Sequence, residues 1–138
     1  MVEINNKADY DLDISRIKRA VEKFLLYFQK EKAEVSVALV DDPEIRELNK
    51  IYRGKDRPTD VLSFPAEEPG DFLGEVIINY QQVSRQAPDF DSSPREELVF
   101  ILVHGLLHLL GYTDDTEETK REMIELGQKL IRELNISL

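Results

Sequence analysis

The spacing of hydrophobic residues divides the chain into helices and strands. Over residues 13–28 apolar residues recur every three or four positions with basic residues between them, which predicts an amphipathic helix. Glu34–Val40 instead alternates valine and leucine with smaller residues and is rich in β-branched side chains, which is typical of a strand. Three shorter stretches also read as strands: residues 2–4, 60–64 and 73–79.

Capping residues predict where two further helices begin and end. Asp42 supplies an N-cap and Pro43 a proline in the first turn, and the helix that follows ends at Gly54. Residues 80–86 predict one or two helical turns, followed by a loop over residues 87–93.

Two longer helices are predicted near the end of the chain. Residues 93–96 (Ser-Pro-Arg-Glu) have the form of a capping box for a helix that runs to about Leu110, with Gly111 in the left-handed conformation after it. A similar capping signature at residues 115–118 precedes a last helix. Its apolar side consists of Met123, Leu126, Leu130, Ile131 and Leu134.

Strands grouped before two late helices predict an α+β fold. The length of 138 residues suits one domain, residues 1–138, with a mixed sheet of about four strands packed against about five helices. The apolar run over residues 98–110 is shorter than the roughly 20 residues that span a bilayer, so we expect a central buried helix there. The first twenty residues contain no signal-peptide-like apolar run, so the sequence predicts a cytoplasmic protein without a membrane association.

Composition limits the chemistry that is available. The chain has no cysteine, which excludes disulfides and thiolate metal sites, so a tight transition-metal site would use His, Asp or Glu. The formal charge of −10 argues against indiscriminate nucleic-acid binding, although a local basic patch can still dominate its neighbourhood.

The central helix carries both histidines of the chain, His104 and His108. Residues four apart on a helix share one face, so the two imidazoles can converge on one metal ion. Asp114 follows the Gly111 turn and can return a third ligand, with Asp115 as a competitor. A buried histidine that is bonded to a backbone carbonyl is the structural alternative.

The spacing matches the extended metzincin motif, His-x3-His-x2-Gly-x2-His, with two substitutions. Gly105 stands where a zinc peptidase has its general-base glutamate, and Asp114 stands at the third ligand. The resulting set of two histidines and one carboxylate is compatible with zinc, but also with manganese, iron or nickel.

Residues 46–57 are the best phosphate-binding candidate, because they hold five basic residues against two acidic ones. A solvated helix end followed by a loop is the alternative reading. We expect Asp60 and Ser63 to fix the turn into the next strand. The basic residues are Arg46, Lys50, Arg53, Lys55 and Arg57.

Together these stretches resemble the YbeY family of single-domain metal-dependent endoribonucleases. The resemblance covers approximately residues 35–130. It is carried by Leu48-Asn49 with Tyr52-Arg53, by residues 57–65 (RPTDVLSFP), by residues 73–77 (LGEVI), and by His104-Gly105-x-Leu107-His108-Leu109-x-Gly111-Tyr112. The family continues Gly-Tyr-Asp-His, so Asp114 stands where its third histidine is expected.

The resemblance implies a single-strand endoribonuclease that acts in rRNA processing at the 16S 3′ end and in ribosome maturation and quality control. It implies zinc on His104, His108 and the position of Asp114, with manganese or nickel possible. Arg53 and His104 would be catalytic, and we expect Lys50, Lys55 and Arg57 to bind substrate. The implied partners are an rRNA precursor and the small ribosomal subunit, and we expect a monomer.

Hydrolysis of an RNA phosphodiester is the expected reaction, with the metal polarising a phosphoryl oxygen or activating water while Arg53 stabilises developing charge. Attack by the RNA 2′-hydroxyl is equally open. Two other functions stay open as well: a metzincin-like metallopeptidase, which Gly105 opposes, and a non-catalytic ribosome-assembly factor with a structural metal.

Overall fold

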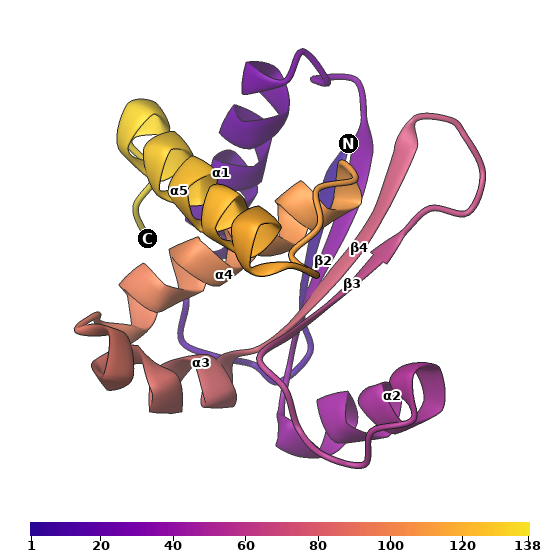
Figure 1. Ribbon diagram of the computed structural model, residues 1–138, viewed down its shortest axis with the longest axis vertical. Coiled ribbons are helices and arrows are strands. Elements are labelled where there is room, and N and C mark those ends of the chain that lie inside the picture. The colour runs from indigo at the N-terminus through magenta and orange to yellow at the C-terminus, as the bar shows by residue number, and fades with distance from the viewer.

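Four strands form one mixed sheet in the computed structural model, which describes residues 1–138 (Figure 1). They are β1 (Val2–Asn6), β2 (Glu34–Val40), β3 (Val61–Pro65) and β4 (Phe72–Asn79), in the order β1-β2-β4-β3. Strands β1, β2 and β4 run parallel to one another, and β3 runs antiparallel to β4 at one edge of the sheet. The prediction of a four-stranded mixed sheet is therefore confirmed.

All five predicted helices are present, and the fold is a single α+β domain. They are α1 (Ile14–Tyr27), α2 (Asp42–Arg53), α3 (Tyr80–Gln86), α4 (Pro94–Leu109) and α5 (Glu117–Leu134). The predicted loop after α3 contains a short 3-10 helix, η1 (Ala87–Phe90). None of the helices combines the length and apolar character needed to cross a membrane.

The N-cap of α2 is Asp41, so the prediction of Asp42 was wrong by one residue. The Asp41 side chain accepts a hydrogen bond from the backbone N–H of Glu44. Asp42 instead accepts hydrogen bonds from Asn79 at 2.6 Å and from Arg85, which tie α2 to the end of β4 and to α3. These contacts with Arg85 and Asn79 hold the pKa of Asp42 below its usual value, against the effect of its burial.

The capping box of α5 is displaced as well, but in the other direction, because it begins one residue later than predicted. Thr116, not Asp115, is the N-cap, and its hydroxyl accepts from the backbone N–H of Thr119 while the Thr119 hydroxyl accepts from the backbone N–H of Thr116. In both cases two neighbouring residues are good caps, so local sequence alone does not choose between them.

The two faces of the sheet are covered unequally. In Figure 1, α1, α4 and α5 lie on one side of the strands and α2 lies alone on the other, near one end of the sheet. Val37 and Val76, paired across β2 and β4, are fully buried on the side of α1 and α4. Ala38 and Ile77 point the other way and pack in a smaller cluster with Ile45 of α2.

Helix α4 is the central buried helix that the sequence predicts. It packs so closely on the sheet that a Cβ placed on Gly105 would lie 2.7 Å from Cγ1 of Val76. Ser63 of β3 donates a hydrogen bond to the carbonyl of Gly105 at 3.2 Å, so Ser63 joins β3 to α4 instead of fixing the turn before β3 as expected. The close contact leaves one stripe of α4 facing away from the core.

Candidate metal centre and its cleft

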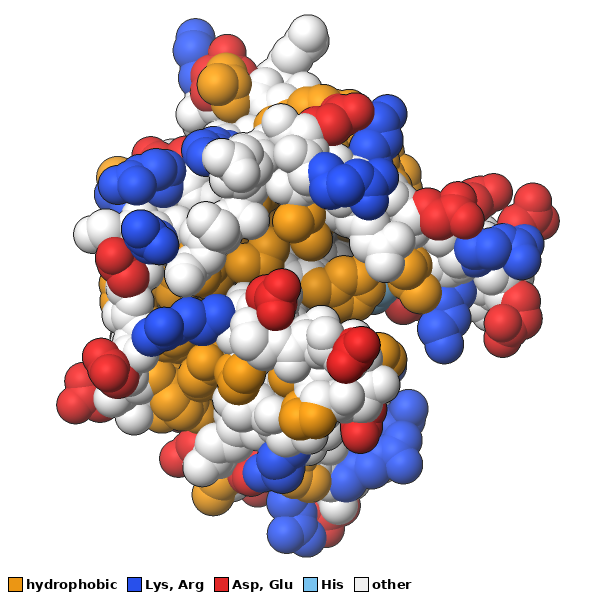
Figure 2. All heavy atoms as spheres, turned by 90° about the vertical axis from the view of Figure 1, so that its left-hand side faces the viewer, with side chains coloured by type: hydrophobic (Ala, Val, Ile, Leu, Met, Phe, Trp, Pro, Cys, Tyr) orange, Lys and Arg blue, Asp and Glu red, His pale blue; other side chains and the backbone are white.

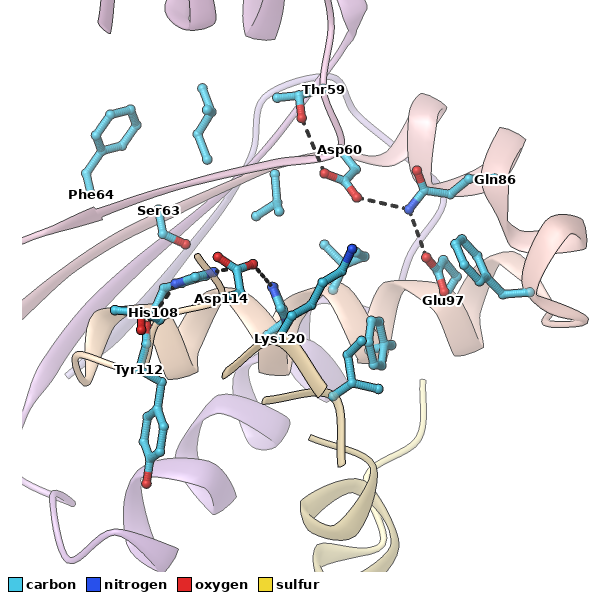
Figure 3. Close-up of a pocket in the computed structure, with 18 of the residues that line it drawn as sticks. Thr59, Asp60, Ser63, Phe64, Gln86, Glu97, His108, Tyr112, Asp114 and Lys120 are labelled. Carbon is cyan, nitrogen blue, oxygen red and sulfur yellow. Dashed lines mark hydrogen bonds and ion pairs between the residues drawn. The ribbon is translucent and has the colours of Figure 1, made fainter. Parts of the chain in front are cut away.

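Three predicted ligands converge at the C-terminal end of α4. His104 Nε2 lies 3.2 Å from Asp114 Oδ2, and His108 Nε2 lies 3.4 Å from the same oxygen. One ligand atom from each residue lies within 4.8 Å of the others, which is a spacing that one metal ion could bridge. Figure 3 shows His108 and Asp114 pointing toward one another in the cleft.

A tight turn after α4 returns Asp114 to the histidines. Gly111 has a φ of 98°, and its N–H donates to the carbonyl of His108. The N–H of Tyr112 donates to the carbonyl of Leu107 at 3.2 Å. Because glycine adopts positive φ without steric cost, the chain can reverse here within a few residues.

Asp115, the competing candidate, points elsewhere. Its Oδ1 accepts a hydrogen bond from the Thr119 hydroxyl at 3.4 Å, at the start of α5. The carboxylate that lies with His104 and His108 is therefore that of Asp114.

The orientation and surroundings of the two imidazoles suit a metal ion. His108 Nδ1 lies 3.0 Å from the carbonyl of Tyr112, which favours a proton on Nδ1 and a lone pair on Nε2. Burial, and next the nearby His108, lower the pKa of His104, while Asp114 acts in the opposite direction. The buried Nδ1 of His104 has no hydrogen-bond partner. Two imidazoles and one carboxylate form a donor set that fits zinc, and also manganese, iron or nickel.

A cleft of about 1190 Å³ extends from these ligands along the edge strand β3. Its walls include residues of β3, α4 and the first turns of α5, and Arg53 at the end of α2 lines it as well. Figure 2 shows hydrophobic side chains in the hollowed centre of one face, surrounded by charged side chains of both signs. Lys50, Lys55 and Arg57 are exposed but lie outside the residues that line the cleft.

The position of Arg53 follows from how α2 ends. The helix ends at Gly54, as predicted, and this glycine adopts the left-handed conformation with a φ of 69°. The buried Asn49 then donates a hydrogen bond to the carbonyl of Arg57 at 2.9 Å, and Asn79 donates to the carbonyl of Thr59 at 3.3 Å. The polar loop beside Arg53 is thus anchored at two points.

One of the five basic residues in this segment is paired. Arg46 Nε lies 2.8 Å from Asp56 Oδ1, with both side chains about half exposed. The pairing raises the pKa of Arg46 and lowers that of Asp56. Arg53 forms no ion pair within the protein, so its charge is available in the cleft.

Sequence reasoning missed four further cleft residues. Gln86 Nε2 donates to Asp60 Oδ2 at 3.0 Å and to Glu97 Oε2 at 2.8 Å (Figure 3). Lys120 reaches the cleft from α5. Only Glu97 had a local signal, because it is a charged residue within an apolar helix, seven positions before His104. Asp60, Gln86 and Lys120 reach the site through tertiary packing, for which the sequence gives no local signal.

Glu97 is only 4% exposed. Its burial raises its pKa, the hydrogen bond from Gln86 lowers it, and the charge of Asp60 raises it further.

The position after the first histidine has no room for a peptidase base. Besides Val76, the Ser63 hydroxyl would lie 3.3 Å from a Cβ on Gly105. A glutamate there would be directed into the packed sheet and not into the cleft. The metallopeptidase alternative is therefore not favoured.

Comparisons with known proteins identify the family to which the chain is related. The family model described as Endoribonuclease YbeY matches residues 3–135. A relative named Endoribonuclease YbeY from Sulfurihydrogenibium sp. is 41% identical over 140 residues, covering 96% of this chain and 92% of the relative. Another of the same name, from Bacillus velezensis, is 43% identical over 135 residues, covering 85% of each.

A solved structure shares the fold as well. The solution structure of TM1509 from Thermotoga maritima superimposes with a TM-score of 0.69 at 34% identity, covering 97% of this chain and 89% of that one. The family model matches nearly the whole chain, and this match confirms the resemblance that the sequence around Arg53 and around His104 and His108 suggests. The chain belongs to the Endoribonuclease YbeY family.

Proposed function

We propose that the chain is a zinc-dependent endoribonuclease that cuts single-stranded RNA during rRNA processing, including the 16S 3′ end, and serves ribosome maturation and quality control. The observation that carries this proposal is that Arg53 lines the same cleft as His104, His108 and Asp114. A guanidinium in the same cleft as a metal-binding group is an arrangement suited to a phosphodiester. The relatives' shared name supports the same activity.

The residues have separable roles in this proposal. His104, His108 and Asp114 hold the metal, which when bound supplies a Lewis acid for the phosphoryl group. Arg53 contacts the non-bridging oxygens and stabilises the charge that develops on them. Asp114 in place of a third histidine adds a negative charge to the donor set, so manganese or nickel can also be accommodated.

Basic residues outside the metal group guide the RNA backbone. Lys50, Lys55 and Arg57 are exposed near Arg53 in sequence and contact flanking phosphates in this proposal. Lys120 supplies a positive charge from another wall of the cleft. These local charges matter because the chain as a whole carries a formal charge of −10, which repels RNA elsewhere.

We also propose that the single domain, residues 1–138, acts as a monomer in the cytoplasm on an rRNA precursor bound to the small ribosomal subunit. Co-sedimentation with purified small subunits measures this association, and a distribution confined to the top of the gradient would contradict it.

The decisive experiment is the Arg53→Ala variant assayed on single-stranded RNA. Cleavage should fall by about 100- to 1,000-fold, as expected for loss of one group that stabilises transition-state charge. Metal content and melting temperature should stay unchanged, since Arg53 is exposed and outside the metal group. Arg19→Ala, on the exposed side of α1, is the matched control and should retain full activity.

The same assay separates the alternatives. Undiminished cleavage by Arg53→Ala would reject the catalytic role of this residue. RNA binding without any cleavage by the metal-loaded chain would instead support an assembly factor with a structural metal. The product ends identify the nucleophile: a 2′,3′-cyclic phosphate means attack by the RNA 2′-hydroxyl and rules out direct attack by water.

A further inference from the structure

The cleft contains a second polar cluster, formed by Asp60, Gln86 and Glu97, which we call the carboxylate end. The Gln86 amide nitrogen lies between the two carboxylates and donates to both, at 3.0 and 2.8 Å (Figure 3). Glu97 Oε1 accepts no hydrogen bond from the protein and is not sealed from the cleft. An almost buried carboxylate that keeps one oxygen free needs a donor to compensate its lost hydration.

The chemistry of this cluster restricts its occupant. Two carboxylates repel a phosphate group, so the RNA backbone is excluded. Both N–H groups of the Gln86 amide are used within the cluster, which therefore offers acceptors only. The occupant must bring N–H donors.

A divalent cation is the other candidate, and the orientation of Gln86 disfavours it. Its amide nitrogen, not its oxygen, lies between Asp60 and Glu97. The oxygen accepts a hydrogen bond from Gln82 Nε2 at 3.2 Å, which holds the amide in this orientation. A cation would need the opposite orientation, since it is bound by oxygen atoms.

Aromatic side chains lie beside the cluster. Phe100 lies one turn along α4 from Glu97 and stacks on His104, with ring centroids 6.0 Å apart and an interplanar angle of 23°. Phe90 of η1 also lines the cleft and is 64% exposed. Flat aromatic faces stack on nucleobases, and a large exposed aromatic in a cleft is typical of a binding surface.

The distance to the metal group fits one nucleotide. Glu97 and His104 are seven residues apart on one helix, which corresponds to about 10 Å along its axis. A nucleotide with its phosphate at the histidines can therefore place its base at the carboxylate end.

We infer that the carboxylate end is a nucleobase subsite that selects guanine next to the cleaved phosphodiester. Guanine presents N1–H and the N2 amino group side by side on its Watson–Crick edge, and a carboxylate accepts both. Uracil presents one N–H between two carbonyl oxygens, which would face Glu97 unfavourably. The inference rests on the proposed function in taking single-stranded RNA as the substrate class.

Binding of RNA in the presence of a metal chelator tests the subsite separately from metal-dependent cleavage. The probes are fluorescent 2′-O-methyl uridine nonamers whose central base is guanine, hypoxanthine or uracil, and the dissociation constants are measured by anisotropy. The unaltered chain should bind the guanine probe about tenfold more tightly than the uracil probe. Hypoxanthine, which keeps N1–H but lacks the amino group, should be intermediate. Equal affinities would overturn the inference whether or not the chain cleaves RNA.

A matched pair of variants assigns the preference to the cluster. Glu97→Gln keeps the side-chain volume but replaces an acceptor, and it should bind the three probes within about twofold of one another. Glu22→Gln, on the exposed face of α1, should keep the guanine preference. Retention of the preference by a folded Glu97→Gln variant would overturn the assignment. If that variant does not fold, the three probes with the unaltered chain still decide.

Calorimetric titration with Mg²⁺ alone tests the competing occupant. No heat that depends on Glu97 should be seen. Magnesium binding that Glu97→Gln abolishes and Glu22→Gln preserves would make the cluster a cation site and overturn the nucleobase reading.

Discussion

The two ends of the cleft lie on one stripe of α4, yet burial has different consequences at each. At the histidine end, formed by His104, His108 and Asp114, burial lowers the pKa of His104 and favours the neutral ring, whose lone pair can bind a cation. At the carboxylate end, burial raises the pKa of Glu97, and the hydrogen bond from the Gln86 amide acts in the opposite direction by stabilising the ionised carboxylate. The type of side chain that α4 presents at each end, together with the groups around it, therefore decides what that end can bind.

The two ends also differ in how far apart their residues lie in the sequence. His104 and Asp114 are ten residues apart and joined by one glycine turn. Asp60, Gln86 and Glu97 come from the loop before β3, from α3 and from α4, and meet only when the sheet and helices have packed. The histidine end is a local structure, whereas the carboxylate end is a product of the fold.

The largest expected effect is at the histidine end. Asp114→Asn removes the negative charge that completes the donor set. Since even partners outside the ligand shell contribute 10- to 100-fold to metal affinity, loss of this ligand should weaken zinc binding by more than about 100-fold and abolish cleavage. Competition with a chromogenic chelator measures the affinity.

Asp115→Asn is the matched control for this change. Its carboxylate contacts Thr119 and lies outside the metal group. Zinc affinity should therefore be unchanged, with a small loss of stability from the start of α5. Equal weakening by both variants would contradict the distinction between the two aspartates.

Gly105→Ala tests the close packing that makes α4 present this stripe. The new Cβ would lie 2.7 Å from Val76 Cγ1, so the buried Val76 or the helix must shift. We expect a loss of about 1–3 kcal/mol in the free energy of unfolding, measured by urea denaturation. Gly127→Ala on α5 is the control, because its Cβ would meet Val103 Cγ1 at 3.9 Å. Gain of helix propensity should make that variant neutral or stabilising by up to about 1 kcal/mol.

Local patterns were enough to predict the histidine end and most of the fold. The i, i+4 spacing of His104 and His108 and the turn at Gly111 are both visible in sequence, and the structure brings these residues together with Asp114. The strand order was not predicted, because β-strand patterns do not specify neighbours. The role of Ser63 was missed because its partner is a backbone carbonyl on α4, 42 residues away.

The carboxylate end shows the limit of sequence reasoning more clearly. Glu97 is visible as an isolated acid in an apolar helix, but nothing in the sequence pairs it with Gln86 or Asp60. The wrongly predicted N-cap of α2 has a different cause. Asp41 and Asp42 are the same residue type and are equally good N-caps, so the local sequence does not choose between them. In that case the tertiary contact of Asp42 with Arg85 and Asn79 decides.

A smaller effect is expected from Lys120, the lysine that reaches the cleft from α5. Lys120→Ala removes an exposed ammonium from the cleft wall. RNA binding should weaken several-fold for all sequences, and the slope of log K against log salt should fall by about 0.7, as for one phosphate contact with a single strand. Lys18→Ala on the exposed face of α1 should change neither quantity. A loss restricted to guanine-containing RNA would place Lys120 at the carboxylate end instead.

The smallest expected effect is the dependence of stability on pH at Glu97. Because its pKa in the folded chain is raised above the ordinary value of 4.5, the folded state binds a proton more readily than the unfolded state in this range. Ionised Glu97 therefore opposes folding at neutral pH, and this penalty disappears as the pH falls through the folded pKa to below 4.5. The quantity to follow is the free energy of unfolding of the unaltered chain minus that of the Glu97→Gln variant. This difference should rise as the pH falls from 7 to 4. Urea denaturation across this range measures the difference, and a fall toward pH 4 would mean that Gln86 stabilises the charged carboxylate more than burial opposes it.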